Sequence, residues 1–245
     1  MIDVERTHEG AVARVWFARP EVHNALSDEL AAALVSRLHE LAHDKSVRVL
    51  VLGGRGPSFC AGADIGAMKA SADATYEQNL AQAEHLAACF GTLADFPKPV
   101  VGRVHGGVYG GGVGFVCGCD IVVSSDDARF GLTEVRLGIL PGIISPYVIR
   151  RIGDRYAREF MLTGERFDAA TALRIGLVHH VAPPAGLDAK VDERVAELLK
   201  GAPGAQHRIK MLLELWADAG WEEYRASLPR VLAEARAGDE AKDGL

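Results

Sequence analysis

The sequence predicts an α/β fold with a helical tail. Three observations predict it. Two short runs rich in β-branched residues enclose a helical pattern near the N-terminus, two glycine-rich loops each follow a strand candidate, and beyond Pro146 the apolar residues recur mainly with helical spacing. Of the 245 residues, 49% are hydrophobic and 24% charged, which is the composition of a globular protein with material for a sizeable core.

The first unit along the chain reads as strand, helix, strand. Val12–Phe17 and Val47–Leu52 are short runs bounded by glycine or proline, as expected of buried strands. Between them Ser27 is the expected N-cap, and the two acidic residues that follow it suit the positive end of a helix dipole. The leucines of one helical face are Leu30, Leu34, Leu38 and Leu41.

The second half of the α/β part contains both glycine-rich loops. A loop over Gly53–Gly66 precedes a long helical pattern, which ends at Pro97 and Pro99. The next strand candidates are Val100–Val104 and Ile121–Ser124. A short strand is expected near Leu177–Val181. The helical segments expected beyond Pro146 are Tyr156–Leu162, Ala169–Ile175, Val191–Leu199 and His207–Trp216.

Charge and composition narrow the class of protein. A formal net charge of −6 and a pI near 5.9 argue against a broad nucleic-acid-binding surface. The N-terminal segment lacks the basic and apolar regions of a signal peptide, and no apolar run approaches the roughly 20 residues that span a bilayer, so we expect a cytoplasmic protein. The four cysteines lack zinc-site spacing and are expected to be buried free thiols.

The two glycine-rich loops are the first candidates for chemistry. They are Phe59–Ile65 and Gly106–Gly114. Glycine lets a ligand approach the backbone closely, so exposed N–H groups can face an oxyanion; a pair of tight turns is the alternative. No Gly-Lys-Ser/Thr follows either loop, and the dinucleotide-binding spacing fits poorly with no acidic residue in the ribose-binding place. Both nucleotide-binding motifs are therefore excluded.

A set of ordered segments resembles the enoyl-CoA hydratase/isomerase (crotonase) family. The resemblance covers most of residues 10 to 185. The matching stretches are Arg19-Pro20, Asn24-Ala25-Leu26, Phe59–Ile65, Pro97–Val100, Gly110-Gly111-Gly112, Cys119-Asp120-Ile121, Ala128–Gly131, Glu134, Leu137-Gly138, Pro141-Gly142, Leu162–Glu165 and Gly176-Leu177-Val178.

The resemblance implies a crotonase-like spiral of ββα units with a C-terminal helical region. Residues 1–185 would form the core with the acyl-CoA site, and residues 186–245 a helical trimerisation region in a homotrimer or a hexamer. The thioester carbonyl of the acyl-CoA would accept hydrogen bonds from the N–H groups of Ala63 and Gly111, with Gly111 near the start of a short helix. Coenzyme A would enter only as part of the substrate, with no metal or other cofactor.

The resemblance also assigns the acid–base group. Hydratases of the family commonly carry two glutamates, and the first of these positions is Gly114 here, whereas the second, 20 residues further on, is Glu134. A single carboxylate can still move the α-proton or share in handling water. From the residues alone, Glu134 also fits an exposed carboxylate at a helix start.

Gly114 and the segment Ile143–Ile149 resemble the bacterial methylglutaconyl-CoA and isohexenylglutaconyl-CoA hydratases. This implies a branched substrate with a distal carboxylate, and the leading expectation is reversible conversion of 3-hydroxy-3-methylglutaryl-CoA to 3-methylglutaconyl-CoA. A substrate carboxylate would also repel a second glutamate. The alternatives are an isohexenylglutaconyl-CoA or general enoyl-CoA hydratase, an enoyl-CoA isomerase, and a non-catalytic acyl-CoA-binding scaffold.

The remaining site candidates are weaker. His23 precedes Asn24, where the family often places a basic residue against the CoA phosphates. Arg55 and Lys69 are alternative phosphate partners, but the favoured interpretation of both is a solvated surface cation. Tyr109, Ser145 and Tyr147 could line the acyl pocket and bind a distal carboxylate, or pack. His105 reads as structural, and Trp216 with Trp221 as core or subunit packing. The full set of substrate-binding candidates is His23, Ala61, Asp64, Ile65, Gly66, Gly114, Tyr109, Ser145 and Tyr147.

Overall fold

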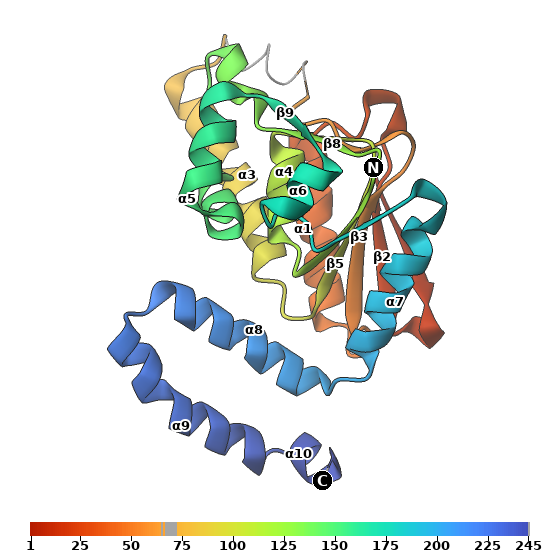
Figure 1. Ribbon diagram of the computed structural model, residues 1–245, viewed down its shortest axis with the longest axis vertical. Helices are drawn as coiled ribbons and strands as arrows, with labels where there is room; N and C mark the ends of the chain where they lie inside the picture. The colour runs from red at the N-terminus through yellow and green to blue at the C-terminus, as the bar shows by residue number, and fades with distance from the viewer. Residues whose placement is uncertain (65, 67–72, 245) are drawn as a thin grey trace.

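Two β-sheets form the framework of the computed structural model, which describes residues 1–64, 66 and 73–244 (Figure 1). The larger sheet has the order β1-β2-β3-β5-β7-β10, with β1 antiparallel to β2 and the other pairs parallel. Its strands are β1 (Ile2–Thr7), β2 (Val12–Phe17), β3 (Val49–Gly54), β5 (Val100–Val104), β7 (Ile121–Ser125) and β10 (His180–Ala182).

The smaller sheet consists of three-residue strands in the order β4-β6-β8-β9. The pairs β4–β6 and β6–β8 are parallel, and β9 is antiparallel to β8. These strands are β4 (Ser58–Cys60), β6 (Gly107–Tyr109), β8 (Arg129–Gly131) and β9 (Arg166–Asp168).

The chain repeats one succession of elements: a strand of the larger sheet, a strand of the smaller sheet and then a helix. β3 and β4 precede α3 (Tyr76–Ala94), β5 and β6 precede α4 (Gly111–Gly118), and β7 and β8 precede a 3₁₀ turn, η3 (Thr133–Leu137), and α5 (Ser145–Thr163). This succession confirms the expected spiral of ββα units.

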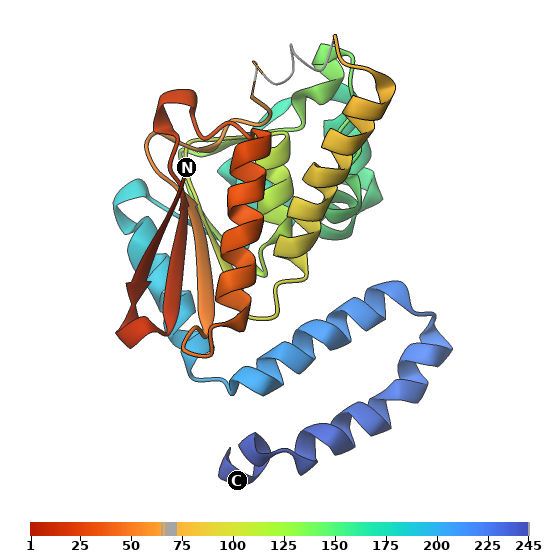
Figure 2. The same cartoon turned by 180° about the vertical axis from the view of Figure 1, so that it is seen from behind.

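Helices cover both faces of the larger sheet (Figures 1 and 2). On one face lies α1 (Asp28–His43), whose N-cap Ser27 accepts a hydrogen bond from the N–H of Leu30 at 3.3 Å. On the other face lies α7 (Leu187–Leu199), which buries Leu187, Val191 and Val195 against alternate valines of β2, β3, β5 and β7. Strands buried on both faces explain the continuous apolar runs of the sequence.

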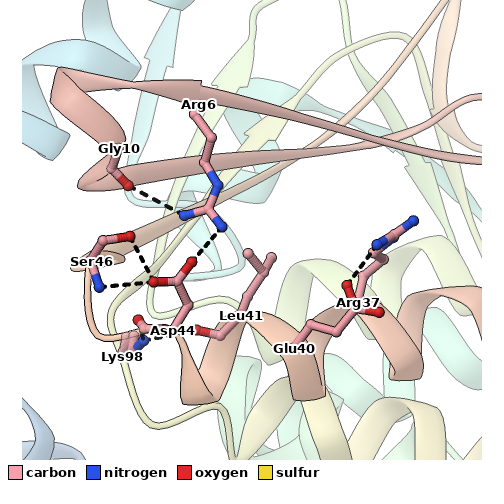
Figure 3. Close-up of polar contacts among 8 residues, drawn as sticks. All are labelled: Arg6, Gly10, Arg37, Glu40, Leu41, Asp44, Ser46 and Lys98. Carbon is pink, nitrogen blue, oxygen red and sulfur yellow. Dashed lines mark hydrogen bonds and ion pairs between the residues drawn. The ribbon is translucent and has the colours of Figure 1, made fainter.

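The C-terminal end of α1 is fixed by a polar cluster around Asp44 (Figure 3). The Asp44 carboxylate accepts hydrogen bonds from the N–H and hydroxyl of Ser46 at 2.9 and 2.6 Å and pairs with Arg6 at 2.6 Å. These contacts, the Ser46 hydroxyl foremost, hold the pKa of Asp44 well below its usual range. Lys98 donates to the carbonyl oxygens of Leu41 and Asp44 at 2.8 and 2.6 Å, so the cluster satisfies the free carbonyls of the helix end.

The helices α8 (Pro203–Asp218), α9 (Trp221–Ala237) and α10 (Asp239–Gly244) extend away from the two sheets (Figures 1 and 2). Lys210 of α8 ties them to the body through an ion pair with Asp120 at 2.7 Å. α7 packs on the larger sheet, and the part of the chain that projects from the two sheets begins at α8. Trp216 and Trp221 are 54% and 58% exposed, so their interpretation as core of the single chain is wrong.

Two further expectations concern burial and membranes. The four cysteines are free thiols; Cys60, Cys89 and Cys119 are buried and Cys117 is half-buried, and burial raises the pKa of Cys60 to about 12. Across the described ranges, no helix combines the length and apolar character that crossing a bilayer requires.

Candidate active site

The two glycine-rich loops lie against each other. A Cβ on Gly62 would lie 3.0 Å from the carbonyl oxygen of Tyr109, and a Cβ on Gly110 would lie 3.8 Å from the Cα of Gly62. Both glycines have positive φ, 92° and 50°, which other residues rarely adopt. Glycine at these two positions therefore lets the backbones of residues 62 and 110 approach closely.

Ala63 is held by a short parallel bridge to Leu26. The N–H of Leu26 donates to the carbonyl oxygen of Gly62 at 2.7 Å, and the N–H of Asp64 donates to that of Leu26 at 3.0 Å. The N–H of Ala63, between these two bonds, takes part in no backbone hydrogen bond within the described part of the chain. It is therefore available to a ligand.

Gly111 is the first residue of α4, as expected. Its N–H precedes the first intrahelical donors, which are the N–H groups of Val113 and Gly114 bonding to the carbonyl of Gly110. The helix dipole adds partial positive charge at this end. Two donor groups on adjacent loops, one at a helix start, can stabilise a negatively charged oxygen.

Glu134 lies beside this helix start. Its Oε1 would be 3.0 Å from a Cβ on Gly110, and its Oε2 is buried without a hydrogen-bond partner among the residues that the structure describes. Burial raises the pKa of Glu134, and a hydrogen bond from its own backbone N–H opposes that effect. Carboxyl groups whose pKa is raised by burial are common among the proton-transferring groups of active sites.

The position of the missing first glutamate is filled by hydrocarbon. A Cβ on Gly114 would lie 2.4 Å from Cγ2 of Ile144 and 2.8 Å from Cε1 of Phe90. Any larger side chain at position 114 would collide with these two, so a carboxylate cannot occupy it without rearrangement. Phe90 could not be recognised as a site residue from the sequence, because a phenylalanine at helical spacing is expected to belong to the hydrophobic core.

The carboxylate of Asp64 holds neighbouring backbone segments together. Its Oδ2 pairs with Arg19 at 3.3 Å, and its Oδ1 accepts the N–H of Gly66 at 2.8 Å. Arg19 also donates to the carbonyl oxygen of Ala25 at 2.9 Å, so it joins the segment before Leu26 to the segment after Ala63. The N–H of Ala61 donates to the carbonyl oxygen of His23 at 3.0 Å, which is a further bond between these two segments.

The candidates for binding CoA phosphates are placed differently from one another. His23 is exposed, and its Nδ1 lies 3.0 Å from the hydroxyl of Ser58. Arg55 pairs with Glu5 and stacks on the ring of Trp16 at 4.3 Å, so the structure uses it in the sheet rather than leaving it free for a phosphate. Ile65 and Lys69 lie outside the described residues.

A cavity of about 740 Å³ adjoins Asp64 and Gly66. Its charged lining residues among those described are Arg19, Asp28, Glu29, Asp64 and Asp73. Among the described lining residues, carboxylates outnumber cations, and this balance does not favour phosphate groups.

The acyl-pocket candidates have different neighbours from one another. Tyr109 carries the guanidinium of Arg166 over its ring at 4.8 Å, and the hydroxyl of Ser145 donates to the carbonyl of Gly142 at 2.7 Å. Tyr147 lines a cavity of about 280 Å³ at the far end of α4, with Cys117, Gly118 and Cys119. The pKa of Tyr147 is raised by burial and by the nearby carboxylates of Asp95 and Glu214. The same cavity is also lined by Arg150, Arg151 and Lys210, so a carboxylate group there would meet positive as well as negative side chains.

His105 is a satisfied histidine, as expected. Its Nε2 lies 2.8 Å from the carbonyl oxygen of Gly56, and its Nδ1 lies 3.2 Å from a guanidinium nitrogen of Arg103. Both ring nitrogens thus have partners on the sheet, which accounts for this residue without chemistry.

The chain is similar to known proteins in both sequence and fold. A family model described as enoyl-CoA hydratase/isomerase matches residues 7–245. The hydroxycinnamoyl-CoA hydratase-lyase of Pseudomonas fluorescens is 32% identical over 235 residues, 93% of this chain and 84% of that protein. An enoyl-CoA hydratase structure from Shewanella pealeana has a TM-score of 0.94 at 34% identity, covering 99% of this chain and 91% of that one. Pseudomonas aeruginosa AtuE has a TM-score of 0.95 at 35% identity, covering 99% and 94%.

Proposed function

The chain belongs to the enoyl-CoA hydratase/isomerase family, and from that premise we propose that it reversibly hydrates a 3-methyl-branched enoyl-CoA, with 3-methylglutaconyl-CoA and 3-hydroxy-3-methylglutaryl-CoA as the substrate pair. The observation that carries the reaction type is the buried Oε2 of Glu134 beside the start of α4, which has no hydrogen-bond partner among the described residues. Burying such a carboxyl group costs folding free energy, and groups of this kind are concentrated at functional sites.

In the hydration direction, Glu134 takes a proton from water while the water oxygen bonds to C3 of the enoyl group. The electrons of the C2–C3 double bond move towards the thioester, and the resulting enolate oxygen accepts hydrogen bonds from the N–H groups of Ala63 and Gly111. Glu134 then gives the proton to C2. The net change is the addition of one water, and the reverse sequence is dehydration.

A single carboxylate fits a branched substrate better than a linear one. The hydroxyl on C3 of the branched product is tertiary, so its departure as water needs less assistance than that of a secondary hydroxyl. The hydrocarbon of Phe90 and Ile144 at position 114 is compatible with a methyl group on C3, and it offers no second acid.

An isomerase is the second candidate, and the observation that favours it is also the glycine at position 114. Shifting a double bond along an acyl chain needs one group that removes a proton from C2 or C4 and returns it elsewhere. Glu134 could do this without activating water. The products separate the two reactions, because only hydration changes the mass.

We also propose that the chain assembles as a homotrimer or hexamer in the cytoplasm and needs no cofactor beyond the CoA of its substrate. Exposed apolar side chains on the projecting α8 and α9 support the assembly. They are Ile209, Met211, Leu213, Trp216, Trp221 and Leu232. An apolar face of this kind is usual at subunit contacts.

The test is an assay of 3-methylglutaconyl-CoA, 3-methylcrotonyl-CoA and crotonyl-CoA by mass spectrometry. The first two share the methyl branch, and only the first carries the distal carboxylate. Rapid gain of water by 3-methylglutaconyl-CoA alone supports the full proposal. Equal rates on both branched thioesters would mean that the enzyme requires the methyl branch but not the distal carboxylate. A shifted double bond without a change of mass would identify the isomerase.

A further inference from the structure

Phe90 packs against one turn of α4, on the side where Gly111 and Gly114 present no side chains. Its Cζ would be 3.4 Å from a Cβ on Gly111, and its Cε1 would be 2.8 Å from a Cβ on Gly114. Ile144, the residue directly before α5, closes the same surface, with Cγ2 at 2.4 Å from the Gly114 position. The two side chains together form what we call the apolar wall.

The apolar wall is rigidly backed. Phe90 and Ile144 are each only 3% exposed. The ring of Phe90 packs on Phe115 with centroids 4.6 Å apart, and the carbonyl of Ile144 accepts the N–H of Val148 at the start of α5. Close packing of this kind resists displacement by a ligand.

The wall and Glu134 lie near successive residues of the same helix start. The carboxylate contacts the Gly110 position at 3.0 Å, whereas the hydrocarbon contacts the Gly111 and Gly114 positions. Consider a thioester carbonyl that accepts a hydrogen bond from the N–H of Gly111. The carboxyl group of Glu134 would lie near Gly110 on one side of it, and the apolar wall would lie near Gly111 itself.

We propose that Phe90 and Ile144 determine acyl specificity, by requiring that the C3 substituent facing α4 be a small hydrocarbon group such as methyl. This inference rests on the proposed function for the orientation of the acyl group. A polar substituent would lose its hydration against this wall, and a large one would displace closely packed side chains.

The wall can be tested by binding, independently of catalysis. Butyryl-CoA, 3-methylbutyryl-CoA and 3-phenylpropionyl-CoA are saturated and cannot be hydrated, so calorimetry measures their affinities directly. In the unaltered protein we expect 3-methylbutyryl-CoA to bind more tightly than 3-phenylpropionyl-CoA. Ile144→Ala and Phe90→Leu should each shift that affinity ratio at least tenfold towards the phenyl compound.

Val148→Ala is the matched control. Val148 is fully buried one turn beyond Ile144 in α5, so its truncation removes buried methyl groups without opening the Gly114 surface. The affinity ratio should stay within twofold of that of the unaltered protein. Ile144→Val replaces Ile144→Ala if the latter does not fold, with a smaller shift in the same direction.

The two proposals fail separately. If no thioester is hydrated but the affinity ratio shifts in the wall variants, the wall stands and the catalytic assignment is wrong. If hydration occurs and the ratio in Ile144→Ala and Phe90→Leu equals that in Val148→Ala, the specificity role of the wall is overturned.

Discussion

Oε1 of Glu134 lies 3.0 Å from the place where a side chain on Gly110 would begin. The approach of the carboxyl group to α4 therefore depends on the absence of a side chain one residue before the donor Gly111. It also couples the acid–base group to the loop whose backbone would hold the thioester, so a disturbance of either is expected to affect both.

Replacing Glu134 with glutamine should lower the hydration rate by about 10²–10⁴-fold, because the amide cannot transfer the proton. Affinity for a saturated acyl-CoA should change little, since the backbone donors remain. Rates and calorimetric affinities measured side by side check this. A variant that retains the full rate would remove Glu134 from the mechanism.

Gly110→Ala should reduce the rate at least tenfold and destabilise the fold by about 1–3 kcal/mol, because it forces a positive φ and pushes on the carboxylate. Gly176→Ala is the matched control. Gly176 has φ 82° and its nearest neighbour would be 3.7 Å away, so that variant should lose stability without losing rate in the remaining folded protein. Equal rate losses in both would mean that the contact with Glu134 is unimportant.

The raised pKa of Glu134 makes stability depend on pH. The ordinary value is 4.5, and the folded state binds the proton more tightly than the unfolded state. The free energy of unfolding should therefore fall as the pH rises from about 4.5 through the raised pKa. In Glu134→Gln this component disappears, so the variant should be more stable than the unaltered protein at pH 8 and lose that advantage by pH 4. Denaturant titrations across this range decide it.

Asp64→Asn should lower the rate about tenfold while leaving the fold intact, because loss of the pair with Arg19 loosens the segment that presents the N–H of Ala63. Glu40→Gln breaks the pair of Glu40 with Arg37, both on the surface of α1, and serves as the control with an unchanged rate. If Asp64→Asn turns over as fast as Glu40→Gln, the ion pair has no positioning role.

Asp44→Asn tests the cluster in Figure 3. The pKa of Asp44 lies well below its ordinary value of 3.8, so its carboxylate contributes stability above about pH 4 that is lost as the pH falls towards the folded pKa. The variant should be less stable at pH 7, and the difference should shrink on acidification. Asp239→Asn, at a carboxylate 94% exposed, should show no such difference at any pH.

The larger elements could be predicted from the sequence because each has a local signal. β2 and β5 have the predicted bounds, and α1 begins after the predicted cap Ser27. The strand predicted near Leu177–Val181 is present as β10 (His180–Ala182), displaced because its pairing with β7, and not its own composition, sets its ends. The smaller sheet was not predicted, since three-residue strands carry no periodicity and exist only through their pairing.

The site divides in the same way. Glu134, Ala63 and Gly111 could be named from motifs, whereas the apolar wall depends on α3 and α5 meeting over α4, which no local pattern specifies. The neighbours of Tyr147 and Arg55 could not be predicted, because a single residue type gives no information about which charges will face it.

The order β4-β6-β8 in the smaller sheet has a consequence for how such a site can change. Ala63, Gly111 and Glu134 each follow one of these parallel strands by two or three residues, so successive turns of the spiral deliver them to one common edge. Neighbouring strands stand about 4.8 Å apart, which fixes the spacing of the three contributions whatever the intervening sequence. A substitution in one repeat therefore changes the side chain presented there without changing the strand spacing, although the contact of Glu134 with Gly110 still links two of the three positions.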